Sequence, residues 1–191
     1  MGNEFAIHRL RSCAALLVLA IGCTAAPAAP QSKLARADAE FLKKAAEAEQ
    51  TEVAAGKVAV AKAVNTQVRG FAQQMIDDHT RHNEELSALA ASKGLELPRD
   101  PSIAQTAKIK LLSSRDGAGF DRSYATTFGV RAHRDALGLF QKAAEHGGDA
   151  DIKAFAAKVL PTLAHHFEMA REMQALVDKE GNAKAIGDRK Q

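Results

Sequence analysis

The chain is 191 residues long, which is enough for one well-buried domain and too short for two large ones. Its 26 basic and 23 acidic residues leave a net charge of +3 and are mixed along every segment, so a nucleic acid-binding surface is not expected. Trp is absent, Pro occurs five times, and Ala, Leu, Lys, Glu and Gln dominate the mature part of the chain. This composition favours helix over strand and predicts an all-α domain.

Residues 1–28 have the layout of a secretory signal peptide. A basic start precedes an apolar run at 13–23, and small residues follow, with an A-x-A cleavage site at 26–28. The run is too short to span a bilayer permanently. The AIGC string at 20–23 also resembles a bacterial lipobox, whose product would attach to a membrane through a lipid on Cys23. Both routes predict export, to the periplasm or to the outer membrane.

Both cysteines, Cys13 and Cys23, lie within this signal segment. The mature domain is therefore expected to have no disulfide, and thiolate and iron–sulfur chemistry are excluded for it. Any metal that the domain binds must be held by His and carboxylate side chains.

After a tether at 29–37, the spacing of the apolar residues predicts a first helix that begins at Asp38, with Asp38 as its N-cap. Gly56 lies in the middle of this helix, where it costs about 1 kcal/mol relative to Ala. We therefore expect another backbone to come close to Gly56. A turn at 64–66 leads into a second helix that ends near Ser92.

Three further helices are predicted in the second half of the chain, followed by a polar tail at 180–191. The first is a short helix at 102–114, inside a long connection at 95–119. The other two lie at about 120–145 and about 151–179 and are joined by a tight turn.

Two hairpins joined by a long connection are the order of a ferritin-like four-helix bundle with a crossover between helices 2 and 3. The bundle domain is assigned to residues 38–179, with the short extra helix lying in the crossover. An up-down-up-down bundle is the alternative. The length of the connection, about 25 residues, favours the crossover because it can run the length of the bundle.

Four polar residues stand on the apolar faces of these helices, where a bundle core normally has aliphatic side chains. Glu52 and His79 lie 13 and 14 residues from Asn65, in the first hairpin turn. His133 and His166 lie 16 and 17 residues from the second turn, at Asp149. Because residues equally far from a turn lie at the same depth in a hairpin, packing of the two hairpins in register would bring all four into one layer.

Three imidazoles and one carboxylate form a ligand set for one transition-metal ion, either Fe, Mn, Zn or Cu. The candidate ligands are Glu52, His79, His133 and His166. Three neighbours are candidates for further ligands or for acceptors that orient an imidazole: Glu49, Asp78 and His82. The di-iron signature, an inward Glu-x-x-His on two helices, is absent from the sequence. The alternative is a buried hydrogen-bonded network that holds no metal.

Three strings in the chain carry a family likeness: FAQQMIDDHTRHNEEL, GAGFDRSYATTFGVRAHRDALGLF and FAAKVLPTLAHHFEMA. They resemble the bacterial domain of unknown function 4142, a ferritin-like helical family of exported or outer-membrane proteins. The resemblance covers about residues 38–177 and implies the fold and the location, but no reaction. It also implies that Glu52 and the three histidines are polar core residues and that Phe120, Asp121 and Tyr124 begin helix 3. Ala132 departs from the family pattern, which commonly has an acid or amide there.

Two functions follow from these features. The first is a metal-binding envelope protein with a redox or stress role, in which the His/Glu layer holds the ion. The second is a non-enzymatic structural or interaction module, in which the same layer fixes the packing of the helices. A solute-binding module that uses the same cavity is a third. The sequence allows a homo-oligomer and identifies no protein partner.

Overall fold

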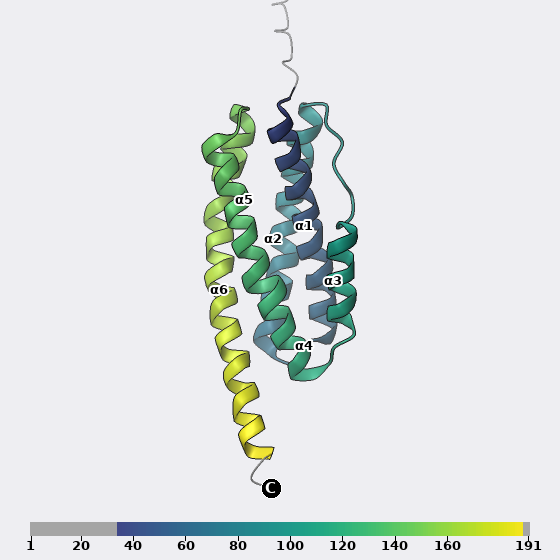
Figure 1. Ribbon diagram of the computed structural model, residues 1–191, viewed down its shortest axis with the longest axis vertical. Coiled ribbons are helices and arrows are strands. Elements are labelled where there is room, and N and C mark those ends of the chain that lie inside the picture. The colour runs from purple at the N-terminus through teal and green to yellow at the C-terminus, as the bar shows by residue number, and fades with distance from the viewer. Residues whose placement is uncertain (1–33, 189–191) are drawn as a thin grey trace, which may run out of the picture. The chain divides into compact units, whose positions relative to one another are not determined.

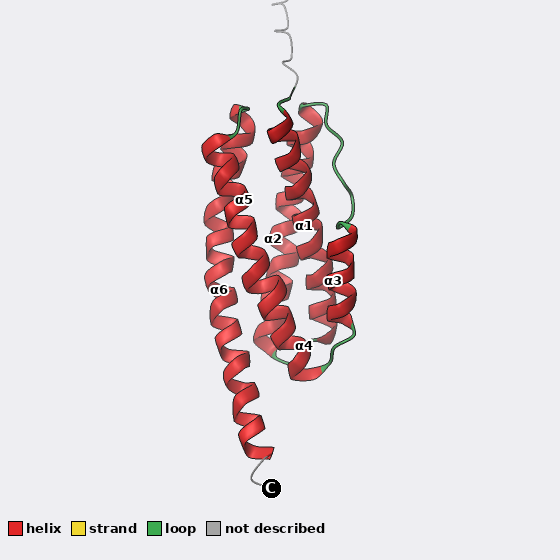
Figure 2. Cartoon of the chain, in the orientation of Figure 1, coloured by secondary structure: helices red, strands yellow, loops and turns green. Residues whose placement is uncertain are grey.

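A computed structural model of the chain describes residues 34–188. The signal peptide predicted at 1–28, with Cys23, lies outside these residues, as does most of the predicted tether. Within the described part no strand is present, which confirms the all-α class (Figure 2). A search of the same residues finds no helix with the length and apolar character that crossing a membrane requires.

The described chain forms a bundle of long helices with a short helix at its side (Figure 1). The elements are α1 (Arg36–Lys62), α2 (Thr66–Ser92), α3 (Ile103–Ser113), α4 (Gly117–Tyr124), the π-helix η1 (Ala125–Arg131), α5 (Ala132–His146) and α6 (Ala150–Asp188).

The arrangement is the predicted ferritin-like bundle with one crossover. α1 and α2 form one antiparallel hairpin and α5 and α6 form the other, and α1 packs against α5 while α2 packs against α6. The connection after α2 returns along the whole bundle and carries α3 on its way to α4 (Figure 1). The up-down-up-down alternative is therefore wrong, because the second and third long helices run in the same direction.

Two of the predicted boundaries differ in the structure, at the start of the first helix and at the end of the last. The first helix begins at Arg36, two residues inside the predicted tether, and its N-cap is Ala35. Asp38 has another role: its carboxylate accepts the backbone N–H groups of Gly148 and Asp149, at 3.1 and 3.0 Å, and so joins the start of α1 to the turn between α5 and α6. The last helix continues to Asp188, so most of the predicted polar tail is helical.

The apolar core has two parts, one toward each end of the bundle. At the end that holds the α1–α2 turn, Phe71, Met75 and Tyr124 are among its buried members. At the opposite end, Phe41 and Phe140 pack edge to face with ring centroids 5.2 Å apart. The buried histidines belong to neither cluster. Along the chain, they lie between residues of one cluster and residues of the other. A polar layer thus interrupts an otherwise apolar interior.

The close approach expected at Gly56 is confirmed. A Cβ atom added there would lie 2.8 Å from Ile76 Cγ1 and 3.0 Å from the carbonyl oxygen of Ala72 on α2. A carbonyl of a helix backbone cannot move aside without shifting the helix, so only Gly allows α1 and α2 to pack this tightly.

We expect Gly56→Ala to destabilise the protein by up to about 2 kcal/mol, because the overpacking cost of about 1–3 kcal/mol exceeds the gain of about 1 kcal/mol in helix propensity. Gly70→Ala on α2 is the matched control, since a Cβ there meets no atom within 4 Å. That variant should be more stable by about 0.5–1 kcal/mol. Urea unfolding of both variants measures the difference, and equal effects would contradict the packing argument.

Candidate metal centre

Three histidines from three helices meet in the polar layer. His79 on α2, His133 on α5 and His166 on α6 are 2%, 1% and 0% exposed. One ring nitrogen from each lies within 4.8 Å of those of the other two. His79 Nε2 and His133 Nε2 are 3.4 Å apart. The structure therefore brings together three of the four predicted ligands.

The second nitrogen of each ring has a hydrogen-bond partner that sets its orientation. His133 Nδ1 lies 2.8 Å from the carbonyl oxygen of Gly129 and 3.1 Å from that of Phe128. Carbonyl oxygens only accept, so Nδ1 carries the proton and Nε2 of the neutral ring has its lone pair free. His166 Nε2 lies 2.9 Å from Asp78 Oδ2 and donates to it. The remaining nitrogen, His166 Nδ1, is buried without a partner among the described residues.

His79 is held by a buried carboxyl group. Glu49 Oε2 lies 2.6 Å from His79 Nδ1 and is itself 2% exposed. Burial raises the pKa of Glu49 to about 8, although the nearby His82 opposes this shift. The acid form of Glu49 can then donate to His79 Nδ1, while His79 Nε2–H donates to the lone pair of His133 Nε2. A cation bound at His79 Nε2 would displace that proton and leave Glu49 as the acceptor.

The π-helix immediately before His133 places the carbonyl oxygens that its ring requires. In η1 the backbone N–H of Ala132 donates to the carbonyl of Thr127, five residues earlier, instead of four. This wider turn presents the Phe128 and Gly129 oxygens to the ring of His133. Short π-helical segments occur frequently at functional sites. Sequence periodicity did not reveal this segment, because one added residue in a turn leaves no marker in composition.

All three imidazoles are neutral at pH 7. Burial lowers the pKa of His79 to about 4, that of His133 to about 3 and that of His166 to about 4. For His133 and His166 the positive forms of the neighbouring histidines lower the pKa further. A neutral imidazole is the form that binds a metal ion, so burial keeps the rings ready to act as ligands.

Glu52, the fourth predicted ligand, does not join the three histidines. It is buried on α1, and burial together with the charge of Glu49 raises its pKa well above the usual value. Its Oε2 has no hydrogen-bond partner among the described residues. Glu49, one helical turn earlier, contacts His79 in its place. Counting residues from the loop between the two helices therefore predicted the position of the carboxylate only to within one helical turn.

The remaining candidates, Asp78 and His82, border the cluster. Asp78 lies beside His166 and also accepts from Arg81 at 2.7 Å. The hydrogen bonds from His166 and Arg81 lower its pKa despite partial burial, which keeps Asp78 ionised. His82 Nδ1 is 3.9 Å from Glu49 Oε2 and forms a second group of ligand types with Glu49 and His79. Of these two residues, Asp78 is the one that accepts a hydrogen bond from a clustered histidine, His166, and so orients its ring.

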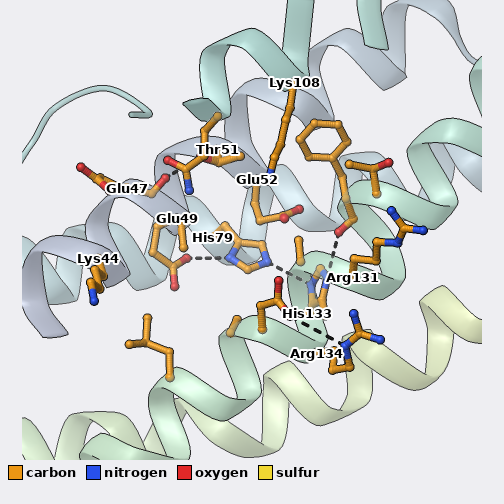
Figure 3. A pocket seen from close by; sticks show the side chains of 18 residues that line it. Lys44, Glu47, Glu49, Thr51, Glu52, His79, Lys108, Arg131, His133 and Arg134 are labelled. Carbon is orange, nitrogen blue, oxygen red and sulfur yellow. Dashed lines mark hydrogen bonds and ion pairs between the residues drawn. The ribbon is translucent and has the colours of Figure 1, made fainter. Parts of the chain in front are cut away.

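A pocket of about 510 Å³ reaches this layer from outside (Figure 3). Side chains of α1, α2, α3, η1 and α5 line it. Glu49, Glu52, His79 and His133 are among its lining residues, so the pocket connects two of the three clustered histidines with its opening.

Comparison with family models gives the family of this chain, and comparison with solved structures gives its fold. A family model described as "Domain of unknown function (DUF4142)" matches residues 23–173. A search of curated proteins finds no match.

Three solved structures of low sequence identity are similar. A DUF305 fragment from Deinococcus radiodurans has a TM-score of 0.64 at 12% identity, over 76% of this chain and 98% of its own. A DUF305 protein from Streptomyces coelicolor, described as secreted, has a TM-score of 0.63 at 16% identity, over 74% and 92%. A conserved hypothetical protein from Mycobacterium tuberculosis has a TM-score of 0.57 at 17% identity, over 73% and 91%. At these identities the likeness shows the fold alone.

Proposed function

We propose that this protein, which belongs to the DUF4142 family, binds one transition-metal ion through His79, His133 and His166. The observation that carries the proposal is the convergence of three buried imidazoles, each oriented through its second nitrogen. Hydrogen bonding of the second nitrogen to a carboxylate or a carbonyl is the usual environment of a metal-binding His.

The chemistry of the nitrogen atoms supports metal binding independently of the distances between them. His166 Nδ1 is fully buried and has no hydrogen-bond partner within the described part of the chain, a state that costs about 1–3 kcal/mol for a buried polar group. A metal ion in contact with this nitrogen would remove the cost. Imidazole nitrogens suit Zn, Cu and Fe, and carboxylate oxygens suit Mn, so the ligand types do not select one of these four metals. Glu49 and Glu52 add nearby carboxyl groups that can balance the charge of a divalent ion.

The proposed role is a redox or stress-related one in the cell envelope. Three protein ligands leave a coordination position open, and a bound Fe, Mn or Cu ion supplies one-electron chemistry at such a position. The pocket that ends at His79 and His133 is the access that this chemistry requires. Export is part of the proposal and is supported by the signal-peptide pattern of residues 1–28, with lipoprotein processing at Cys23 as the alternative to cleavage at 26–28.

Elemental analysis tests the metal proposal directly. Protein purified from the periplasmic fraction, without added metal or an affinity tag that binds metal, should contain close to one equivalent of a transition metal. His79→Ala should reduce the content to less than about a tenth of an equivalent, because removing one of three ligands leaves too few for tight binding.

His165→Ala is the matched control, because His165 is the exposed neighbour of His166 in α6. It should leave the metal content unchanged. A wild-type content below about a tenth of an equivalent, unaffected by His79→Ala, would reject the proposal. The layer would then be the hydrogen-bonded network of the structural alternative.

A further inference from the structure

The pocket above the histidines is larger than a metal ion needs. Its volume of about 510 Å³ lies within the range of about 300–1,000 Å³ that is typical of small-molecule sites. Its apolar lining comes from η1, α5 and α1: Phe128, Ala132, Ala136, Leu139 and Ala48. The pocket can therefore enclose a ligand with an apolar body.

Positive side chains surround this pocket on several sides. Lys44 comes from α1, Lys108 from α3, Arg131 from η1 and Arg134 from α5, and all four are exposed. Figure 3 shows Lys44 on one side, Lys108 above, and the two arginines on the opposite side. The positive charge therefore comes from four separate elements.

The negative charges of the lining do not cancel this field. Asp135 lies 3.7 Å from Arg134 and offsets that one cation. Glu47 is the other acidic side chain outside the buried layer, which contains Glu49 and Glu52. Lys44, Lys108 and Arg131 form no ion pair within 4.0 Å among residues 34–188. These three unpaired cations outnumber the one remaining anion, Glu47, so the opening of the pocket carries a net positive charge.

We propose that this pocket binds a small organic anion, such as a monocarboxylate with an apolar body, whose charge is held by Lys44, Lys108 and Arg131. The apolar wall would bury the body of the ligand, and the cations of the rim would attract its charged group. The site goes beyond the metal proposal, because these residues and this volume are present whether or not an ion lies below.

The proposal gives a role to the short helix of the crossover. Apart from Leu112, α3 has no fully buried residue, so it contributes little to the core. Its ends are nevertheless well fixed: Ser102 and Gln105 form a capping box, and Lys62 Nζ donates to the carbonyl of Ser113 at 2.6 Å. Lys108 is thereby kept at the pocket.

The test uses benzoate as the anionic probe and benzamide as its neutral counterpart of equal shape. Each is titrated into the isotopically labelled, metal-free protein while amide NMR signals are followed, among them those of the lining residues Thr51 and Thr127. Benzoate should bind about three to thirty times more tightly than benzamide, since the exposed cations of the rim attract only the charged probe and each contributes modestly. Added salt should weaken the binding of benzoate only.

Two double variants separate the pocket from net charge. Lys44→Ala/Lys108→Ala should reduce the affinity for benzoate about threefold to tenfold and leave that for benzamide unchanged. Lys43→Ala/Lys110→Ala removes the same charge from the same two helices, at exposed positions that do not line the pocket, and should have no such effect. Equal affinities for the two probes in the wild type, or equal losses in the two variants, would overturn the proposal. Because the protein is metal-free throughout, failure of the metal proposal would not decide this result.

Discussion

Zinc added to the metal-free protein is expected to raise its melting temperature by about 8–16 °C. An ion that binds only the folded state adds about 4 kcal/mol of stability at a free concentration 1,000 times its dissociation constant. In a chain of this length, 1 kcal/mol corresponds to about 2–4 °C. The large effect follows from the fold, because the three imidazoles come from three helices and are brought together only when α2, α5 and α6 pack.

Differential scanning calorimetry with and without zinc measures this shift, and a chelator should reverse it. His133→Leu should abolish the shift, because it removes the ligand whose lone pair faces His79 Nε2 at 3.4 Å. His165→Ala should retain the full shift. An equal shift in wild type and His133→Leu would place the zinc elsewhere on the chain, for example at exposed His146.

The second large effect is a loss of stability in acid that depends on His133. The pKa of this buried ring is about 3, below its value in the unfolded chain, about 6.5. Above pH 6.5 the ring is neutral in both states and pH has no effect through it. As the pH falls below 6.5, the unfolded chain takes up a proton that the folded protein does not, so stability is lost progressively toward pH 3.

Urea unfolding of the metal-free protein at pH 7 and pH 4 measures this loss against that of His133→Leu. The wild type should lose roughly 2–3 kcal/mol more than the variant over this interval. Glu49 acts in the opposite direction: its raised pKa adds stability below about pH 4.5 that is lost as the pH rises toward 8. Since both proteins contain Glu49, the comparison cancels its contribution. A variant as acid-sensitive as the wild type would show that His133 is protonated in the fold.

Several features of the site were accessible from the sequence because they depend on local periodicity. The positions of His79, His133 and His166 on apolar helical faces predicted that they would be buried, and all three are. The sequence could not show which of Glu49 and Glu52 contacts His79. Residues three apart share a helical face, so periodicity sets which face is buried but not the axial offset between helices.

Apolar spacing and turn residues act over short stretches of chain, so the sequence was enough to predict the all-α class, to favour two hairpins with a crossover, and to place the three histidines in the interior. The tertiary structure alone decided that Glu49, Asp78 and the Gly129 carbonyl orient those rings, and that α3 completes a positively charged pocket above them. Such contacts join residues far apart in the chain. They depend on helix offsets of a few ångströms and on one π-helical turn, neither of which leaves a periodic signal.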